Sequence, residues 1–227
     1  NTDLIRFAPK GRMGLYFLTP GAGQRAADIV YDRAGSSFAQ DASGSDWFAA
    51  KPDWFHTSGI SFAVGAEKIA LDAMAAAKAA GASVSFDSNF RAKLWADRGV
   101  DPRPSLTQAF KACNLLFADH RDIALVTGES VATADDAARI AFALSPQLDT
   151  LAFTERKVLS ADHHELTGVM FTRSGVTRTK PHRVAGIVDR IGGGDAFAAG
   201  VHHGRASGWD AQKTIDFAVA AAVLKHY

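Results

Sequence analysis

The residues best suited to chemistry are nine consecutive positions near the end of the sequence, Asp189-Arg190-Ile191-Gly192-Gly193-Gly194-Asp195-Ala196-Phe197. Three adjacent glycines leave the backbone N–H groups uncovered by Cβ atoms, so an anion can approach them closely. The alanine-rich run after Asp195 predicts a helix whose unsatisfied first-turn N–H groups and positive dipole end face the glycines. Asp195 then either caps that helix or acts as a base beside a bound phosphate. The segment indicates phosphoryl transfer, with Gly192, Gly193, Gly194 and Asp195 as candidate catalytic residues.

Two other interpretations of the glycines have to be weighed. A glycine-rich turn before a helix is often only a tight connection. The dinucleotide fingerprint Gly-x-Gly-x-x-Gly also opens helices, but the spacing from Gly192 to Gly200 does not fit it. A Walker-type Gly-x4-Gly-Lys-Ser/Thr sequence does not occur in the chain. The flanking Asp189 and the Asp-Ala-Phe sequence favour the phosphate site over a plain turn.

Composition agrees with a soluble enzyme and shows no bias toward nucleic acid or anionic membranes. The 227 residues are 47% hydrophobic and 22% charged, with a net charge of +1, which indicates neither nucleic acid nor an anionic membrane as partner. The single cysteine, Cys113, lies in an apolar run and the chain has no Asn-x-Ser/Thr acceptor, so a reducing, cytoplasmic location is expected. Apolar stretches of membrane-spanning length are absent from the sequence.

Strand-like and helix-like segments alternate from about residue 54 onward. Thr133 with Asp136 three residues later is a helix start of the capping-box type. Such alternation predicts an open α/β sheet with helices on both faces, where ligands bind beyond the carboxyl ends of the strands. The predicted strands lie at 54–56, 83–87, 115–117 and 151–153, with hairpin strands in 168–188, and the predicted helices at 66–80, 104–112, up to 127, 133–144 and twice after the glycines.

The first forty residues have a different pattern. Residues 13–18 and 28–33 read as two strands without a helix between them, which predicts an antiparallel flap. Alternation in the second strand places Ile29, Tyr31 and Arg33 on one face. That face either contacts a substrate or belongs to a solvated edge strand.

The glycine segment resembles the C-terminal signature of the ribokinase-like (PfkB) carbohydrate kinases, and the resemblance is greatest to the 2-keto-3-deoxygluconate kinases of that family. It implies a three-layer α/β/α open sheet with a small antiparallel β lid. We therefore expect residues 1–40 to form the lid and residues 41–227 the kinase core. Besides the glycine segment, the matching stretches are Gly14-Leu15-Tyr16-Phe17, Tyr31-Asp32-Arg33-Ala34-Gly35-Ser36, Ser58-Gly59-Ile60, Asp87-Ser88-Asn89-Phe90-Arg91 and Leu94-Trp95.

The resemblance also implies roles for individual residues. Asp195 would be the catalytic base that takes the proton of the substrate's primary hydroxyl. The residues that would contact the acid sugar are Tyr16, Tyr31, Arg33, Asn89 and Arg91. Two arginines suit a keto-deoxy acid, because their planar forks donate charge-assisted hydrogen bonds to a carboxylate.

ATP and Mg2+ are the implied cosubstrate and metal. Gly192, Gly193, Gly194 and Asn89 would contact the nucleotide, as would Thr154 and Arg156, unless the polar stretch 154–157 is only a solvated turn after a strand. Magnesium bridges nucleotide phosphates in kinases. Asp119 and Asp122 stand where the family has Asn-x-x-Glu, and would hold Mg2+ through water.

The expected reaction is ATP-dependent phosphorylation of 2-keto-3-deoxygluconate to its 6-phosphate. Two alternatives stay open: a ribokinase-like kinase of a neutral sugar such as fructose or of a nucleoside, and a non-catalytic sugar- or nucleotide-binding module. The expected partners are a small sugar acid and a second copy of the chain bound through the lid. Relative to the family, the chain is expected to be shortened at both ends.

Overall fold

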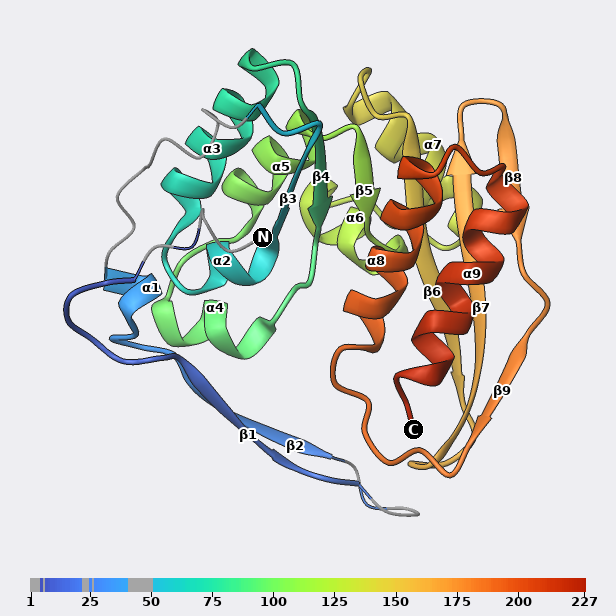
Figure 1. Cartoon of the computed structure of the whole chain (residues 1–227), viewed down its shortest axis with the longest axis horizontal. Helices are drawn as coiled ribbons and strands as arrows, with labels where there is room; N and C mark the ends of the chain where they lie inside the picture. The colour runs from blue at the N-terminus through green and yellow to red at the C-terminus, as the bar shows by residue number, and fades with distance from the viewer. Residues whose placement is uncertain (1–4, 6, 22–24, 26, 41–50) are drawn as a thin grey trace. The chain divides into compact units, whose positions relative to one another are not determined.

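The computed structural model describes residues 5, 7–21, 25, 27–40 and 51–227 (Figure 1). These residues group into two compact units, which are described one at a time. The predicted domain boundary after residue 40 borders the undescribed residues 41–50, so it stays a prediction. The first unit is 1–17, 30–116 and 120–148, and the second is 18–29, 117–119 and 149–227.

The predicted flap is present as a two-stranded sheet of β1 (Leu15–Thr19) and β2 (Asp28–Asp32), drawn in blue in Figure 1. Half-buried and exposed residues alternate from Ile29 to Arg33, which confirms that Ile29, Tyr31 and Arg33 share a face. The short helix α1 (Ser37–Gln40) follows, and the sequence did not predict it.

In the first unit, β3 (Trp54–Ser58), β4 (Ser83–Asp87) and β5 (Leu115–Phe117) lie in that order in the sheet. β3 and β4 are parallel, and Ser58 pairs with Asp87 at their carboxyl ends. The predicted strands are therefore confirmed. The helices between and after them are α2 (Gly59–Ala63), α3 (Glu67–Ala79), α4 (Ala92–Arg98), α5 (Arg103–Ala112), α6 (His120–Thr127) and α7 (Ala134–Leu144).

Local sequence explains where these helices begin and end. Gly81 and Gly128 follow α3 and α6 with φ of +86° and +73°, a conformation that costs glycine little. Thr133 caps α7, because its hydroxyl accepts the N–H of Asp136 at 3.1 Å. The sequence did not predict the short helices α2 and α4.

Aromatic side chains fill the core of the first unit. Phe86 of β4 contacts Phe62 of α2 edge-on at 5.3 Å and Phe110 of α5 at 6.0 Å between ring centroids. All three rings are at most 1% exposed. This packing fixes α2 and α5 against the sheet, and with them the ends of β3 and β4.

The second unit is built on antiparallel strands: β6 (Thr150–Val158), β7 (His163–Thr172), β8 (Gly175–Arg178) and β9 (His182–Ala185). β7 pairs with β6, β8 and β9. The hairpin expected around residues 174–175 is confirmed. β6 is longer than predicted, because residues 154–157 continue the strand and pair with β7.

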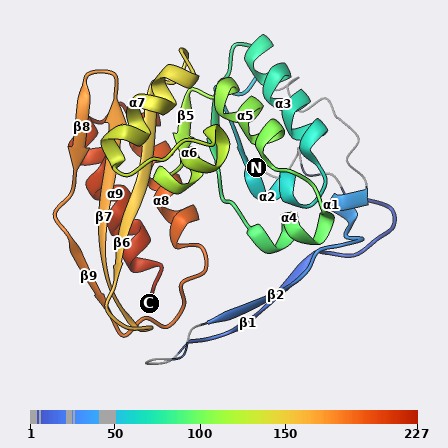
Figure 2. The ribbon, with the colours of Figure 1, turned by 180° about the vertical axis from the view of Figure 1, so that it is seen from behind.

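Two helices, α8 (Gly193–Ala206) and α9 (Ala211–Leu224), cover one face of β6 and β7, in front of them in Figure 1 and behind them in Figure 2. They lie very close to each other. A Cβ at Gly200 would stand 2.5 Å from the Cα of Ala218, so only glycine allows this approach. Among the described residues, no helix combines the length and apolarity needed to cross a membrane.

Candidate active site

The glycine segment forms a tight loop that leads into α8. The Asp189 carboxylate accepts the N–H of Ile191 at 2.9 Å through Oδ1. Gly192 is the N-cap residue with φ 80° and ψ 2°, and its carbonyl accepts the N–H of Ala196 at 2.8 Å. The predicted strand-loop-helix order is present, so the positive end of the α8 dipole points at the glycines.

Each of the three glycines stands in a different environment. Gly192 has a left-handed backbone. A Cβ on Gly193 would stand 3.1 Å from Cε1 of the His226 ring, which is tighter than almost all real contacts. A Cβ on Gly194 would meet no atom within 4 Å. The backbone conformation explains why residue 192 is a glycine, and the contact with His226 explains residue 193. Nothing within the described chain explains why residue 194 is a glycine.

Two backbone donors and one carboxylate at the start of α8 have no partner in the described part of the chain. The N–H groups of Gly194 and Asp195 donate to no acceptor there, and the Asp195 carboxylate makes no hydrogen bond or ion pair. Both residues are exposed. Asp195 therefore does not cap α8, and the two N–H groups are available to an anion beside a carboxylate without a partner in the described residues.

The residues just after α9 hold this loop in place. The His226 carbonyl accepts the N–H groups of Val188 at 3.0 Å and of Asp189 at 3.3 Å. The His226 ring is 5% exposed, and its Nδ1–H donates to the carbonyl of Ala222 at 2.6 Å. Lys225 Nζ lies 3.4 Å from Asp189 Oδ2. The Ile191 N–H, and then Lys225, lower the pKa of Asp189 below its usual value.

A buried histidine, His164 of β7, lies within electrostatic reach of Arg156 of β6 and of Arg190 in the glycine loop. In β6 and β7, Thr154 and Arg156 pair with Gly168 and Leu166, so they share the sheet face with His164, two residues before Leu166. His164 is fully buried, and neither ring nitrogen has a hydrogen-bond partner among the residues that the structure describes. Burial lowers its pKa first, and the charges of Arg156 and Arg190 lower it further.

Tyr31 and Arg33, both predicted to contact substrate, lie together on the flap. The Arg33 guanidinium carbon is 5.5 Å from the centre of the Tyr31 ring. Arg33 Nε is buried without a hydrogen-bond partner among the described residues. The nearby Arg12 behaves differently, because its guanidinium makes two hydrogen bonds to the Asp32 carboxylate, at 2.5 and 3.0 Å. Arg12 is thus a structural arginine, whereas Arg33 makes no ion pair among the described residues.

Asn89 and Arg91 follow the carboxyl end of β4. Asn89 has φ +37°, in the left-handed region, and its N–H donates to the Asp87 side chain at 3.1 Å. Its amide side chain makes no hydrogen bond within the described residues. Arg91 is exposed, and among the described residues its guanidinium donates to the Phe90 carbonyl alone, at 3.3 Å. Tyr16 on β1 is 43% exposed.

Asp119 and Asp122 lie just before and within the first turn of α6 and are partly buried. Searching the described residues finds no group of three His, Cys, Asp or Glu side chains placed to hold a metal ion. Magnesium commonly uses one or two carboxylates together with waters and phosphate oxygens. A magnesium site at Asp119 and Asp122 stays a prediction.

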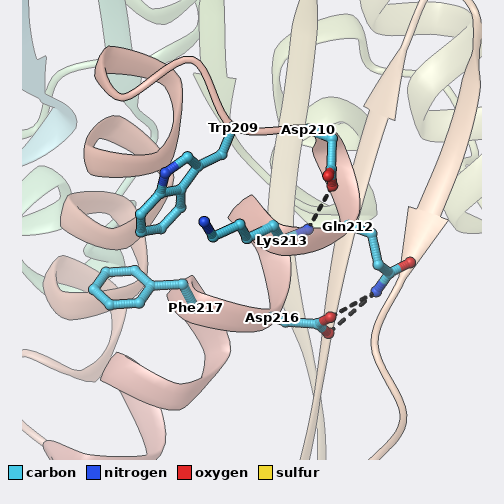
Figure 3. A pocket seen from close by; sticks show the side chains of 6 residues that line it. All are labelled: Trp209, Asp210, Gln212, Lys213, Asp216 and Phe217. Atoms are coloured by element: carbon cyan, nitrogen blue, oxygen red, sulfur yellow. Dashed lines mark hydrogen bonds between the residues drawn. The ribbon is translucent and has the colours of Figure 1, made fainter.

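A hollow of about 490 Å³ lies at the other end of α8 (Figure 3). Lys213 lies over the Trp209 ring, 4.2 Å from its centre, and Phe217 contacts Trp209 edge-on. Asp210 caps α9 by accepting the Lys213 N–H at 2.8 Å. Since α8 has 14 residues, about 20 Å of helix separates this hollow from the glycine loop. Its side chains connect α8 to α9 and do not belong to the anion site.

The sequence of this chain matches the family described as pfkB family carbohydrate kinase over residues 1–226. The chain belongs to the pfkB family of carbohydrate kinases. It is 26% identical to a 2-dehydro-3-deoxygalactonokinase of Haloferax volcanii, over 97% of this chain and 67% of the relative. The ribokinase-like expectation from the sequence, and with it the assignment to sugar kinases, is confirmed.

Solved structures of pfkB kinases have the same fold as this chain. A pfkB family carbohydrate kinase from Listeria grayi superimposes with a TM-score of 0.87 at 34% identity, over 96% of this chain and 69% of that one. A 2-dehydro-3-deoxygluconokinase from Thermotoga maritima gives 0.84 at 33% identity, over 95% and 69%. The predicted α/β/α sheet with a small β lid is therefore the fold of this chain, which spans about two thirds of the length of these relatives.

Sequence reasoning missed three residues at the glycine loop. Arg190, Lys225 and His226 were not predicted to belong to the site. Arg190 lies inside the signature, and the basic pair Lys225-His226 directly follows the apolar helix α9. That basic pair was a signal in the sequence, but only the fold shows which loop it contacts.

Proposed function

We propose that this pfkB kinase transfers the γ-phosphoryl group of ATP to the primary hydroxyl of 2-keto-3-deoxygluconate. The observation that carries the proposal is the start of α8. Gly194 has open space where a side chain would lie, its N–H and that of Asp195 lack acceptors among the described residues, and the Asp195 carboxylate has no partner there. An anion bound at these N–H groups would accept hydrogen bonds and stand beside a base.

In the proposed reaction, Asp195 accepts the proton of the substrate hydroxyl as its oxygen attacks the γ-phosphorus. The bond between that phosphorus and the bridging oxygen breaks, and ADP leaves. The N–H groups of Gly194 and Asp195 stabilise the charge on the transferred group. Mg2+ would neutralise phosphate charge when bound. Asp119 and Asp122 are the residues proposed to hold it through water, and Thr154, Arg156 and Asn89 those proposed to contact ATP.

The choice of an acid sugar rests on Arg33 and Arg91. Neither guanidinium makes an ion pair in the described residues, and Arg33 keeps a buried Nε without an acceptor. A buried donor without a partner is costly, and a substrate carboxylate would satisfy it with a charge-assisted bond. Two relatives act by name on 2-dehydro-3-deoxy sugar acids, which supports the same substrate class. Tyr16, Tyr31 and Asn89 would supply the neutral contacts.

The lid is also proposed to join two copies of the chain. Leu15, Phe17 and Val30 of the two-stranded sheet are apolar and between 44% and 58% exposed. Exposed apolar side chains on a small sheet commonly mark a protein contact. Sedimentation should therefore show a dimer, and Phe17→Ser should shift it to the monomer. A monomeric parent protein would refute this part of the proposal.

Steady-state kinetics on the full natural protein tests the activity. Asp195→Asn keeps the shape of the side chain and removes the proton acceptor, so kcat should fall by about 10²–10⁴-fold. Asp210→Asn is a matched control, because asparagine caps a helix as well as aspartate does. ADP release should be followed with 2-keto-3-deoxygluconate, its galactonate epimer and fructose. Faster turnover of fructose than of either acid would replace the acid-sugar proposal with a neutral-sugar kinase, and full activity of Asp195→Asn would refute the catalytic mechanism.

A further inference from the structure

Lys225 follows α9 and lies directly against the glycine loop. Its Cε is 3.4 Å from the position where a Gly192 Cβ would stand, so the side chain runs across the N-cap of α8. Its Nζ reaches Asp189 Oδ2 at 3.4 Å. The ammonium group is thus at the turn that leads to the two free N–H groups of Gly194 and Asp195.

Asp189 transmits this contact to the backbone. One carboxylate oxygen faces Lys225, and the other accepts the N–H of Ile191 at 2.9 Å. Ile191 is followed by Gly192, whose left-handed backbone turns the chain into α8. Lys225, Asp189 and the Ile191 N–H therefore form a continuous link that sets the direction of the first-turn N–H groups.

The ion pair itself is a poor source of stability. The side chains of Lys225 and Asp189 are 44% and 42% exposed, and exposed pairs contribute little to the free energy of unfolding. A lysine at the end of α9 is favourable for the dipole of that helix, but any cation placed there would serve equally. The specific placement over Gly192 is better explained by the loop that it orients.

We propose that Lys225 is a positioning residue for phosphoryl transfer, which acts through Asp189 to hold the anion-binding N–H groups of α8 in their reactive orientation. The inference rests on the proposed kinase activity and adds a residue to it. Small displacements of groups that orient a reacting centre commonly cost about 10²-fold in rate. We expect Lys225→Met to lower kcat by about 10- to 100-fold while the KM for the sugar acid changes less than threefold.

The test compares five variants of the full protein, Lys225→Met among them, by kinetics and thermal unfolding. Lys225→Arg should keep activity within about threefold of the parent, because it can still reach Asp189. Lys213→Met is the matched control, a lysine at the other end of α9 and far from the loop. Asp189→Asn and the double variant Asp189→Asn with Lys225→Met should be about equally slow, since both break the same link. Tm should change little in Lys225→Met.

Several results would overturn the inference. The first is a Lys225→Met variant whose kcat stays within threefold of that of an active parent. The second is a double variant in which the losses of kcat of the two single variants multiply. The third is a loss of kcat that is explained by a fall in Tm. A parent without kinase activity would refute the proposed function as well. The two proposals can therefore fail separately.

Discussion

Gly194→Ala should separate catalysis from folding most cleanly. The new methyl group would meet no atom of the described chain within 4 Å, and the backbone of Gly194 is not in the left-handed region. Alanine in a helix is more stable than glycine by up to about 1 kcal/mol, and Gly194 is the second residue of α8. The expected change in Tm is a rise of about 1–4 °C for a chain of this size.

The same methyl group would occupy the space through which an anion reaches the free N–H groups. Loss of one such donor commonly costs 10²–10³-fold in kcat. Gly194→Ala should therefore become slower by about that factor and slightly more stable. Calorimetry and ADP-release kinetics on one preparation measure both quantities.

Gly193→Ala is the control, and this variant should be less stable than the parent. Its Cβ would stand 3.1 Å from the buried His226 ring, whose hydrogen bond to Ala222 resists displacement. Forced contacts of this kind cost about 1–3 kcal/mol. A stable Gly194→Ala enzyme with parental kcat/KM would refute the anion site and leave the three glycines as a turn.

Two further predictions concern Arg33 and His164. Arg33→Met should lower kcat/KM for the keto-acid by about 10- to 150-fold, because the variant loses a hydrogen bond to a charged group. The kcat/KM for fructose should barely change. An equal loss for both substrates would assign Arg33 to lid folding. Burial lowers the pKa of His164 in the folded state below its usual value of 6.5, so on acidification the unfolded chain takes up this proton at a higher pH than the folded chain does. Stability should therefore fall as pH drops below about 6.5, and Tm measured from pH 7.5 to 5 should fall less in His164→Leu than in the parent. Equal slopes would show that another group controls the acid sensitivity.

The sequence predicted those elements whose signals are local. β4 and β5 are short runs with buried apolar side chains, and both match the predicted limits. The capping pair at Thr133 likewise located the start of α7. β6 was predicted too short, because Thr154 to Lys157 are polar and resemble a turn. Their strand conformation comes from pairing with β7, which no local pattern shows.

The site divides in the same way. Gly192 to Asp195 could be predicted because the helix start and its anion-binding groups are consecutive in sequence. Lys225 and His226 could not, since their contacts with the loop join residues more than thirty positions apart. Asn89 was predicted by resemblance alone, and its left-handed backbone gives a physical reason for an asparagine there.

The two hydrogen bonds to the His226 carbonyl have a consequence for local opening of the protein. The last turn of a helix frays more readily than its middle, and the amides bonded to it exchange when it opens. Val188 and Asp189 donate to His226, two residues beyond the last residue of α9, so their amides should open together with that end of the helix rather than with the sheet. The loop that precedes α8 thus belongs to the same cooperative unit as a segment that follows it by a whole helical hairpin.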